Sequence, residues 1–264
     1  MAVMTTRRAI VRMPEGGEPS GTPDDLVGEA PLVLAMAGEP IATLMRTPGH
    51  DIELSAGWLV VESGVGRAED IVTLRACREA DTDRVHVTLR DGVRPPRPRA
   101  FVTSAACGVC SADVLDLTPL RERPPHDDGW TVARAVLAAL PDTMRVRQPT
   151  FERTGGVHAA ALADADGALL VVREDVGRHN AVDKVTGWAL LDGRLPASGH
   201  LLVVSGRVSF EIVQKAVAAG VAGIVAVSAP SSLAVDLARE YDILLAGLVR
   251  GGRMNVYAGE HLIR

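Results

Sequence analysis

"LLVVSGRVSFEIVQKAVAAGVAGIVAVSAPSSLAVDLAREYDILLAGLV" occupies residues 201–249, and this stretch decides the fold. Its apolar runs at 201–204 and 224–227 are short and uninterrupted, which is typical of strands buried on both faces of a sheet. Segments with helical periodicity separate these runs from each other and from a third apolar run at 242–249. Helices between neighbouring strands imply right-handed parallel crossovers, so the stretch predicts the parallel part of an α/β sheet.

The residues just upstream extend this region. A helix is predicted over 131–140, a hairpin from the runs 156–164 and 168–175, and a second helix over 177–193 that Gly193 stops. Because a hairpin adds antiparallel strands to parallel ones, the sheet is expected to be mixed. The predicted fold of residues 130–264 is therefore a three-layer α/β/α sandwich.

The N-terminal half has a different pattern. Residues 1–30 are rich in Gly, Pro, Glu and Asp, which predicts a loosely ordered leader. Strand-like runs and one helix, with Thr47 as its N-cap, predict a small α+β domain over 31–100. Prolines then break the pattern, and residues 101–129 are expected to form a linker.

The composition limits the class of protein. The chain has 264 residues and a formal net charge of -5, which argues against general affinity for nucleic acid or anionic membranes. It lacks an apolar run of the roughly 18 residues that a spanning helix needs, and its N-terminus has no secretory pattern. We therefore expect a cytoplasmic protein with neither nucleic-acid nor membrane partners.

The predicted linker carries a cysteine pair, Cys107 and Cys110, in "TSAACGVCS" at 103–111. Three chemical interpretations remain open for a C-x-x-C pair: a zinc site completed by distant histidines, a thioredoxin-like redox motif, or a thiolate that accepts and releases sulfur. The third cysteine, Cys77, lies alone and is expected to be an inert packing residue.

Polar and small residues follow several predicted strands. In open α/β sheets ligands bind beyond the carboxyl ends of the strands, where helix N-termini and loop amides converge. A nucleotide-like ligand is therefore plausible at these turns. The candidate residues are Thr154, Gly155, Gly156, Arg178, His179, Asn180, Asp183, Lys184, Ser205, Gly206, Arg207, Ser228, Ala229 and Ser231.

Simpler explanations exist for each of these residues. Serines after a strand are often helix N-caps, and the charged residues of 173–184 could form a solvated, salt-bridged face. His158 is more often a structural residue than a ligand. A zinc deaminase is excluded because His158 is followed by Ala159 and Ala160, which leaves no H-x-E glutamate.

Several long motifs together resemble the FdhD family of sulfur carrier proteins. In chain order they are "SAACGVCS", "TGGVHAAAL", "REDVGRHNAVDKVTGWAL", "SGRVSFEIVQKA", "VSAPSSLAVDLA" and "LVRGGRMNVY". The resemblance spans roughly residues 39–257, and motifs of this length are far more specific than C-x-x-C alone. It implies a cytidine-deaminase-like fold for the second domain.

The resemblance also implies an activity. Family members are sulfurtransferases that receive persulfide sulfur from a cysteine desulfurase. They pass it to the molybdenum or tungsten bis-pyranopterin guanine dinucleotide cofactor of formate dehydrogenase. By the same resemblance, Cys107 would be the persulfide carrier and Cys110 the second thiol. The alternative function is a non-catalytic chaperone that binds the same cofactor, and a more distant one is a zinc-stabilised binding module.

The resemblance adds one ligand-binding stretch and an oligomeric state. It implies a homodimer whose sites hold the two guanine nucleotide ends of the cofactor. It also points to a C-terminal stretch whose glycines and arginines suit phosphate. That stretch comprises Leu248, Val249, Arg250, Gly251, Gly252 and Arg253.

Overall fold

The structure, a computed structural model, describes most of the chain. Cys107 and Cys110, with most of the predicted linker, lie outside the described residues. None of the described helices combines the length and the apolar composition that a membrane span requires. The described residues are 3–79, 82–96, 102–103 and 129–264.

A six-stranded mixed sheet forms the larger half of the molecule, with strand order β13-β12-β11-β10-β8-β9. The strands β10, β11 and β12 are parallel, as the 201–249 stretch predicts. The others pair antiparallel with their neighbours. The strands are β8 (His158–Ala163), β9 (Leu169–Asp175), β10 (Leu201–Val204), β11 (Gly223–Ala226), β12 (Leu244–Arg250) and β13 (Arg253–Ala258).

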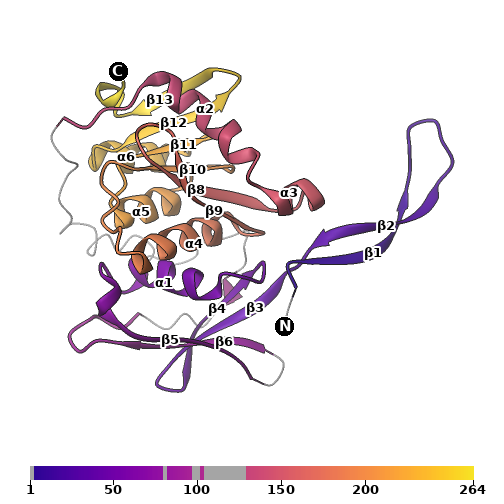
Figure 1. Ribbon diagram of the computed structural model, residues 1–264, viewed down its shortest axis with the longest axis horizontal. Coiled ribbons are helices and arrows are strands. Elements are labelled where there is room, and N and C mark those ends of the chain that lie inside the picture. Colours follow the sequence, from indigo (N-terminus) through magenta and orange to yellow (C-terminus); the bar gives the residue numbers. More distant parts are fainter. Residues whose placement is uncertain (1–2, 80–81, 97–101, 104–128) are drawn as a thin grey trace.

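Helices cover both faces of this sheet, so the mixed α/β layering is confirmed (Figure 1). Successive strand residues alternate between two buried clusters: Leu202 packs with α4 and α5, and Val203 packs with α2. This alternation explains why the strands are apolar throughout. The helices are α2 (Arg134–Arg145), α3 (Pro149–Thr154), α4 (Arg178–Leu191), α5 (Phe210–Ala219) and α6 (Ser232–Glu240), with a 3-10 turn at η4 (Glu260–Leu262).

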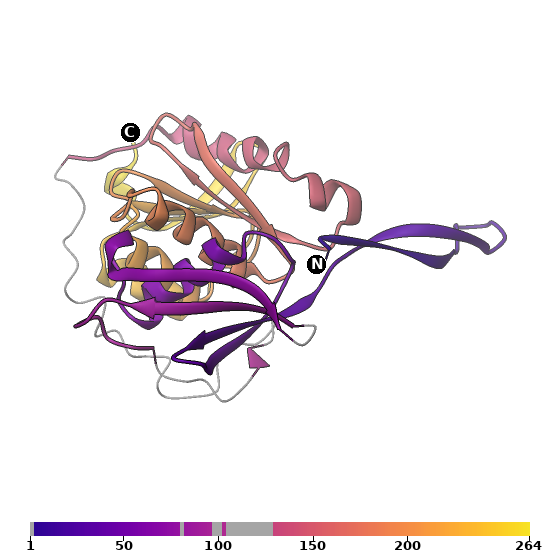
Figure 2. The same ribbon diagram turned by 60° about the horizontal axis from the view of Figure 1, so that its bottom comes forward.

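A second sheet of five strands, in the order β5-β6-β3-β4-β7, forms the smaller half, and Figure 2 brings it forward. Helix α1 lies between this sheet and α4. The described strand β7 ends four residues before Cys107 in the sequence. The elements are β3 (Ala30–Met36), β4 (Glu39–Arg46), α1 (Asp51–Glu62), η1 (Ala68–Asp70), β5 (Ile71–Glu79), β6 (Thr82–Leu89) and β7 (Val102–Thr103).

The predicted N-cap of α1 is wrong. The helix begins at Asp51 after His50, which adopts a left-handed conformation, and Thr47 is fully buried upstream. The Thr47 hydroxyl accepts a hydrogen bond from the Val176 amide (3.0 Å), and the Thr47 amide donates to Asp175 (3.1 Å). Thr47 therefore joins the two halves of the molecule instead of capping its own helix.

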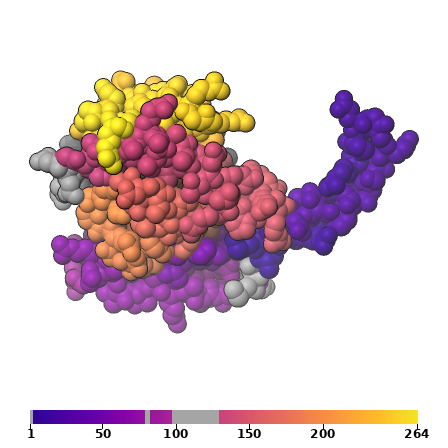
Figure 3. Space-filling model, turned by 45° about the horizontal axis from the view of Figure 1, so that its top comes forward, coloured from indigo at the N-terminus to yellow at the C-terminus, as the bar shows by residue number. Residues whose placement is uncertain are grey.

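The N-terminal residues do not form a loose leader. Strands β1 (Thr5–Arg12) and β2 (Ser20–Val27) pair along their whole length in an antiparallel hairpin, which projects from the body (Figure 3). Its root is fixed by Arg153, whose guanidinium contacts Thr5 (3.0 Å) and Asp25 (3.4 Å). The turn-rich residues between the strands dominate the composition of residues 1–30, so this composition does not indicate the two strands.

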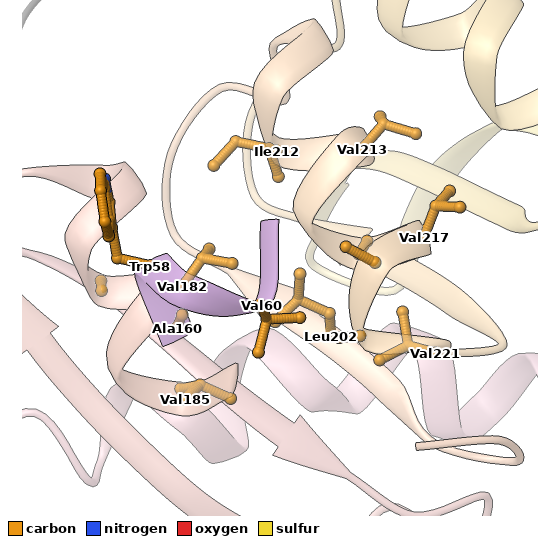
Figure 4. Packing of buried hydrophobic residues seen from close by; sticks show 14 of the residues in the cluster. Trp58, Val60, Ala160, Val182, Val185, Leu202, Ile212, Val213, Val217 and Val221 are labelled. Carbon is orange, nitrogen blue, oxygen red and sulfur yellow. The ribbon is translucent and has the colours of Figure 1, made fainter. Parts of the chain in front are cut away.

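The two halves share one hydrophobic core. Trp58 and Val60 of α1 lie in the same buried cluster as Val182 and Val185 of α4 and Val213 of α5 (Figure 4). Because this cluster continues into both sheets, the small half is packed against the helices of the large half as one body.

Glycines let α1 and α4 approach to backbone contact. A Cβ atom at Gly57 would lie 1.9 Å from the Asp183 carbonyl oxygen, and one at Gly187 would lie 1.8 Å from the Glu53 carbonyl oxygen. No larger residue fits at either position without moving a backbone. The helix crossing therefore depends on both glycines.

Candidate functional site

The predicted strand-end residues meet at one edge of the large sheet. Val204 at the end of β10 pairs with Ala226 at the end of β11 and with Ala160 near the start of β8. His158 at the start of β8 pairs with Asp175 at the end of β9. The loops after β9, β10 and β11 therefore lie along a single edge, next to the N-terminus of α4.

Backbone hydrogen bonds fasten these loops to one another. The Val208 amide donates to the Ala229 carbonyl (3.2 Å), and the Ser231 amide donates to the Val208 carbonyl (2.9 Å). The Leu248 amide donates to the Ser228 carbonyl (3.2 Å). Sequence segments that are far apart, around 206, 229 and 248, thus form a continuous surface.

Two of the candidate serines have structural contacts at this edge. Ser205 accepts a hydrogen bond from the Ala159 amide (2.9 Å) and so fixes the loop after β10 to β8. Ser231 caps α6 by accepting from the Ala234 amide (3.3 Å). The N-cap explanation therefore holds for Ser231, whereas the backbone carbonyls of Ser228 and Ala229 accept the hydrogen bonds that join the loops.

A cluster of basic side chains surrounds Gly206. A Cβ atom at Gly206 would lie 3.2 Å from Nδ1 of His158 and 3.6 Å from Cβ of Arg178. Burial lowers the pKa of His158, and the charges of Arg178, His179 and Arg207 lower it further. Burial also lowers the pKa of Arg178, with Arg207 adding to the effect. The site therefore carries closely spaced positive charge beside a histidine that favours its neutral form.

His179 has protein partners at the same edge. Its Nε2 atom lies 2.9 Å from the Glu211 carboxylate and 3.2 Å from the Ser209 hydroxyl, both at the start of α5. The carboxylate of Glu211 therefore contacts the imidazole of His179. It remains near enough to Arg178 to oppose, weakly, the fall in the pKa of that arginine.

Asn180, Asp183 and Lys184 are buried, and their side chains contact other groups of the protein. Lys184 is fully buried, and its Nζ atom contacts Asp175 (2.7 Å) and the carbonyl of Thr47 (2.9 Å). Asn180 donates to Asp175 (3.0 Å). Asp183 forms a buried ion pair with Lys215 (2.7 Å). These polar residues therefore do not form a solvated face.

Asp175, one of the charged residues of 173–184, has a structural role that the sequence did not reveal. Its buried carboxylate accepts hydrogen bonds from the Thr47 and Gly177 amides and from Asn180, in addition to its ion pair with Lys184. It thereby fixes the residue before Arg178 and joins α4 to the small half. The position of Asp175 at a predicted strand end marked it as a candidate residue. Its contact with Thr47, which is distant in the sequence, could not be inferred.

The Thr154–Gly156 turn flanks the cluster. The Thr154 hydroxyl is occupied within its own turn, donating to the Thr150 carbonyl (2.7 Å) and accepting from the Gly156 amide (3.2 Å). Gly155 ends α3 in a left-handed conformation, as a C-cap glycine commonly does. Val27 at the root of the hairpin lies against Gly156. This turn contributes exposed glycine backbone and no side-chain hydroxyl.

The C-terminal stretch reaches the edge at one end only. Leu248 is 45% exposed and has a positive φ of 54°, an uncommon conformation for leucine. The Val249 side chain is buried in the core. Gly251 and Gly252 form the turn between β12 and β13, and the exposed Arg250 and Arg253 flank that turn in register. Leu248 and the two arginines are thus the side chains of this stretch that a ligand could contact.

No group of three or more histidine, cysteine or acidic side chains suited to a metal ion occurs among the described residues.

Comparisons with known proteins cover most of the chain. The sequence profile of the FdhD/NarQ family matches residues 27–264. The chain belongs to the FdhD/NarQ family.

Relatives of this FdhD/NarQ chain match over nearly their whole length. It is 48% identical to a sulfur carrier protein FdhD from Nocardia farcinica, covering 99% of this chain and 95% of the relative. It is 49% identical to the protein of that name from Anaeromyxobacter dehalogenans, covering 90% and 88%. The crystal structure of a "putative formate dehydrogenase accessory protein" from Desulfotalea psychrophila matches with a TM-score of 0.79 and 27% identity, covering 99% of this chain and all of that one.

Proposed function

We propose that this protein is a sulfur carrier that supplies sulfur to the molybdenum or tungsten bis-pyranopterin guanine dinucleotide cofactor for formate dehydrogenase. The observation that carries the proposal is the end-to-end match to proteins named sulfur carrier protein FdhD. The formate dehydrogenase accessory protein of similar structure supports the choice of acceptor enzyme. A cysteine desulfurase is the chemical class that supplies such sulfur.

Cys107 and Cys110 provide the sulfur chemistry in this proposal. The Cys107 thiolate attacks the outer sulfur of the desulfurase persulfide, so a new S–S bond forms on Cys107 and the donor thiolate leaves. The Cys110 thiolate can then attack the inner sulfur of Cys107, which forms a disulfide and releases the outer sulfur as sulfide for the metal. A cellular thiol must reduce that disulfide before the next cycle.

The edge of the large sheet is the proposed place for the nucleotide ends of the cofactor. Arg178, Arg207 and the Gly206 turn supply positive charge and backbone for phosphates, and Leu248 supplies an exposed apolar side chain beside Ser228. Asn180, Asp183 and Lys184 act behind this surface by fixing the start of α4. The residues that contact the cofactor are therefore distinct from those that hold these contacts in place.

Mass spectrometry of the intact protein tests the sulfur-carrier role. After incubation with a cysteine desulfurase and cysteine, we expect the intact mass to rise by one sulfur, about 32 Da, and digestion to place that sulfur on the segment that contains Cys107 and Cys110. Cys77→Ser should gain the same mass, and Cys107→Ser should lose most of it. Sulfur addition that persists when both Cys107 and Cys110 are replaced would contradict the assignment.

A further inference from the structure

We infer that Thr47 is a positioning residue for sulfur delivery: its buried contacts fix the end of strand β4, and with it the start of the cysteine-bearing segment, against the turn that joins β9 to α4. The inference rests on the proposed function, because it names a residue that the delivery step needs although it carries no sulfur. The contacts of Thr47 with Asp175, Val176 and Lys184 are called the Thr47 junction below.

The two parts of the proposed chemistry belong to different halves of the molecule. Strand β7 belongs to the small sheet, and Cys107 follows it by four residues in the sequence. The candidate residues at the strand ends belong to the large sheet. The placement of the cysteine-bearing segment relative to that edge therefore depends on the contacts that fix one half to the other.

Strands β4 and β7 run in the same direction. They pair in parallel, with Thr43 opposite Val102 and Leu44 opposite Thr103. Because β4 leads directly to Thr47, the C-terminal end of β7 lies at the same end of the small sheet as Thr47. A shift of the end of β4 would therefore move the point from which the cysteine-bearing segment starts.

All three polar groups of Thr47 contact the large half. Its amide donates to the Asp175 carboxylate (3.1 Å), its hydroxyl accepts from the Val176 amide (3.0 Å), and its carbonyl accepts from Nζ of Lys184 (2.9 Å). The residue before a proline favours an extended backbone, and Pro48 follows Thr47. The amide and carbonyl of Thr47 are therefore left outside helix α1 and are available to the other half.

The main contribution of this junction is position. A buried ion pair such as that of Lys184 and Asp175 gains little stability over well-packed apolar side chains of the same size, although removing one partner alone is costly. Apolar packing has no preferred direction, whereas hydrogen bonds require short distances and narrow angles. Asn180 of α4 adds a further hydrogen bond to the Met45 carbonyl (2.8 Å). The last residues of β4 are thus held in one register against the large half.

Sulfur delivery is sensitive to such a register. A misplacement of about 1 Å can lower the rate of a group-transfer step about 100-fold. Valine matches the shape of threonine but has no hydroxyl, so Thr47→Val would leave the Val176 amide without its acceptor in buried surroundings. The junction would have to rearrange, and the end of β4 would shift with it.

Two measurements on the same full-length variants test the inference. Intact mass after incubation with a cysteine desulfurase and cysteine measures sulfur loading. Formate dehydrogenase activity in cells that lack their own sulfur carrier, divided by the amount of folded variant, measures delivery. We expect Thr47→Val to load sulfur like the parent protein and to deliver about tenfold less or worse. Thr47→Ser keeps the hydroxyl and should deliver nearly as well as the parent.

Leu137→Ala is the matched control for lost stability. Leu137 of α2 is fully buried in the cluster on the opposite face of the large sheet from α4. This variant should unfold in urea at least as easily as Thr47→Val and should still deliver sulfur like the parent. Thr47→Ala, which leaves room for a water molecule at the Val176 amide, should show the same loss of delivery and replaces Thr47→Val if that variant does not fold.

Three results would overturn the inference. They are parental delivery by Thr47→Val, an equal loss of delivery in Leu137→Ala, and a loss in Thr47→Ser as large as that in Thr47→Val. Failure of the parent protein to load sulfur would instead contradict the proposed function, so the two failures are distinguishable.

Discussion

Replacing Gly187 with alanine is expected to lower the free energy of unfolding by about 3 kcal/mol or more, at the upper end of overpacking effects. The new methyl group would lie 1.8 Å from the Glu53 carbonyl oxygen and 2.7 Å from the Gly57 amide nitrogen. Both contacts are with backbone, so no side-chain rotation can relieve them. Helices α1 and α4 would have to separate, and the core shared by the two halves would open.

Urea unfolding, followed by circular dichroism, measures this effect. Gly66→Ala is the matched control, because Gly66 has no positive φ and no atom within 4 Å of its Cβ position. It should change the free energy of unfolding by less than about 0.5 kcal/mol. Equal stabilities for Gly187→Ala and Gly66→Ala would contradict the backbone contact between the helices.

Replacing Lys184 with methionine is expected to cost about 3–5 kcal/mol, the usual result of removing one partner from a buried ion pair. Both side chains of the pair with Asp175 are fully buried. Methionine nearly matches the size of lysine, so the loss would come from leaving a carboxylate uncompensated and the Thr47 and Glu174 carbonyls without their donor. Urea unfolding at neutral pH measures the loss.

The exposed pair Arg194 and Asp192 is the control for the Lys184 variant. Asp192→Asn should change the free energy of unfolding by at most about 1 kcal/mol, because solvent screens that pair. If Lys184 instead contacted a ligand from an exposed position, Lys184→Met would unfold like the control and lose ligand affinity. That outcome would reverse our placement of Lys184 in the interior.

The large sheet was predictable because its strands satisfy a local rule. Residues such as Leu202 and Val203 face opposite layers of helices, so the strand must be apolar throughout. Such an uninterrupted apolar run can be seen directly in the sequence. The positions where the strands end were predictable because the apolar runs end there. Gly206 and Arg207, which follow one such run, do lie next to Arg178 at one edge of the sheet.

The interior polar residues were not predictable. A charged residue such as Lys184 resembles a surface or ligand residue until its partner is known, and Thr47 lies 137 positions away. The prediction for the N-terminal residues differs from the structure for another reason. The hairpin pairs Thr5 with Val27 across a turn-rich stretch whose composition indicates disorder. Both errors concern contacts between residues distant in sequence.

Formate dehydrogenase activity in cells that lack their own sulfur carrier tests the central claim most directly. Cells supplied with this protein, or with Cys77→Ser, are expected to produce active enzyme. Cells supplied with the double variant Cys107→Ser and Cys110→Ser should show only background activity. Full enzyme activity with the double variant would contradict the account and would favour a chaperone that binds the cofactor without transferring sulfur.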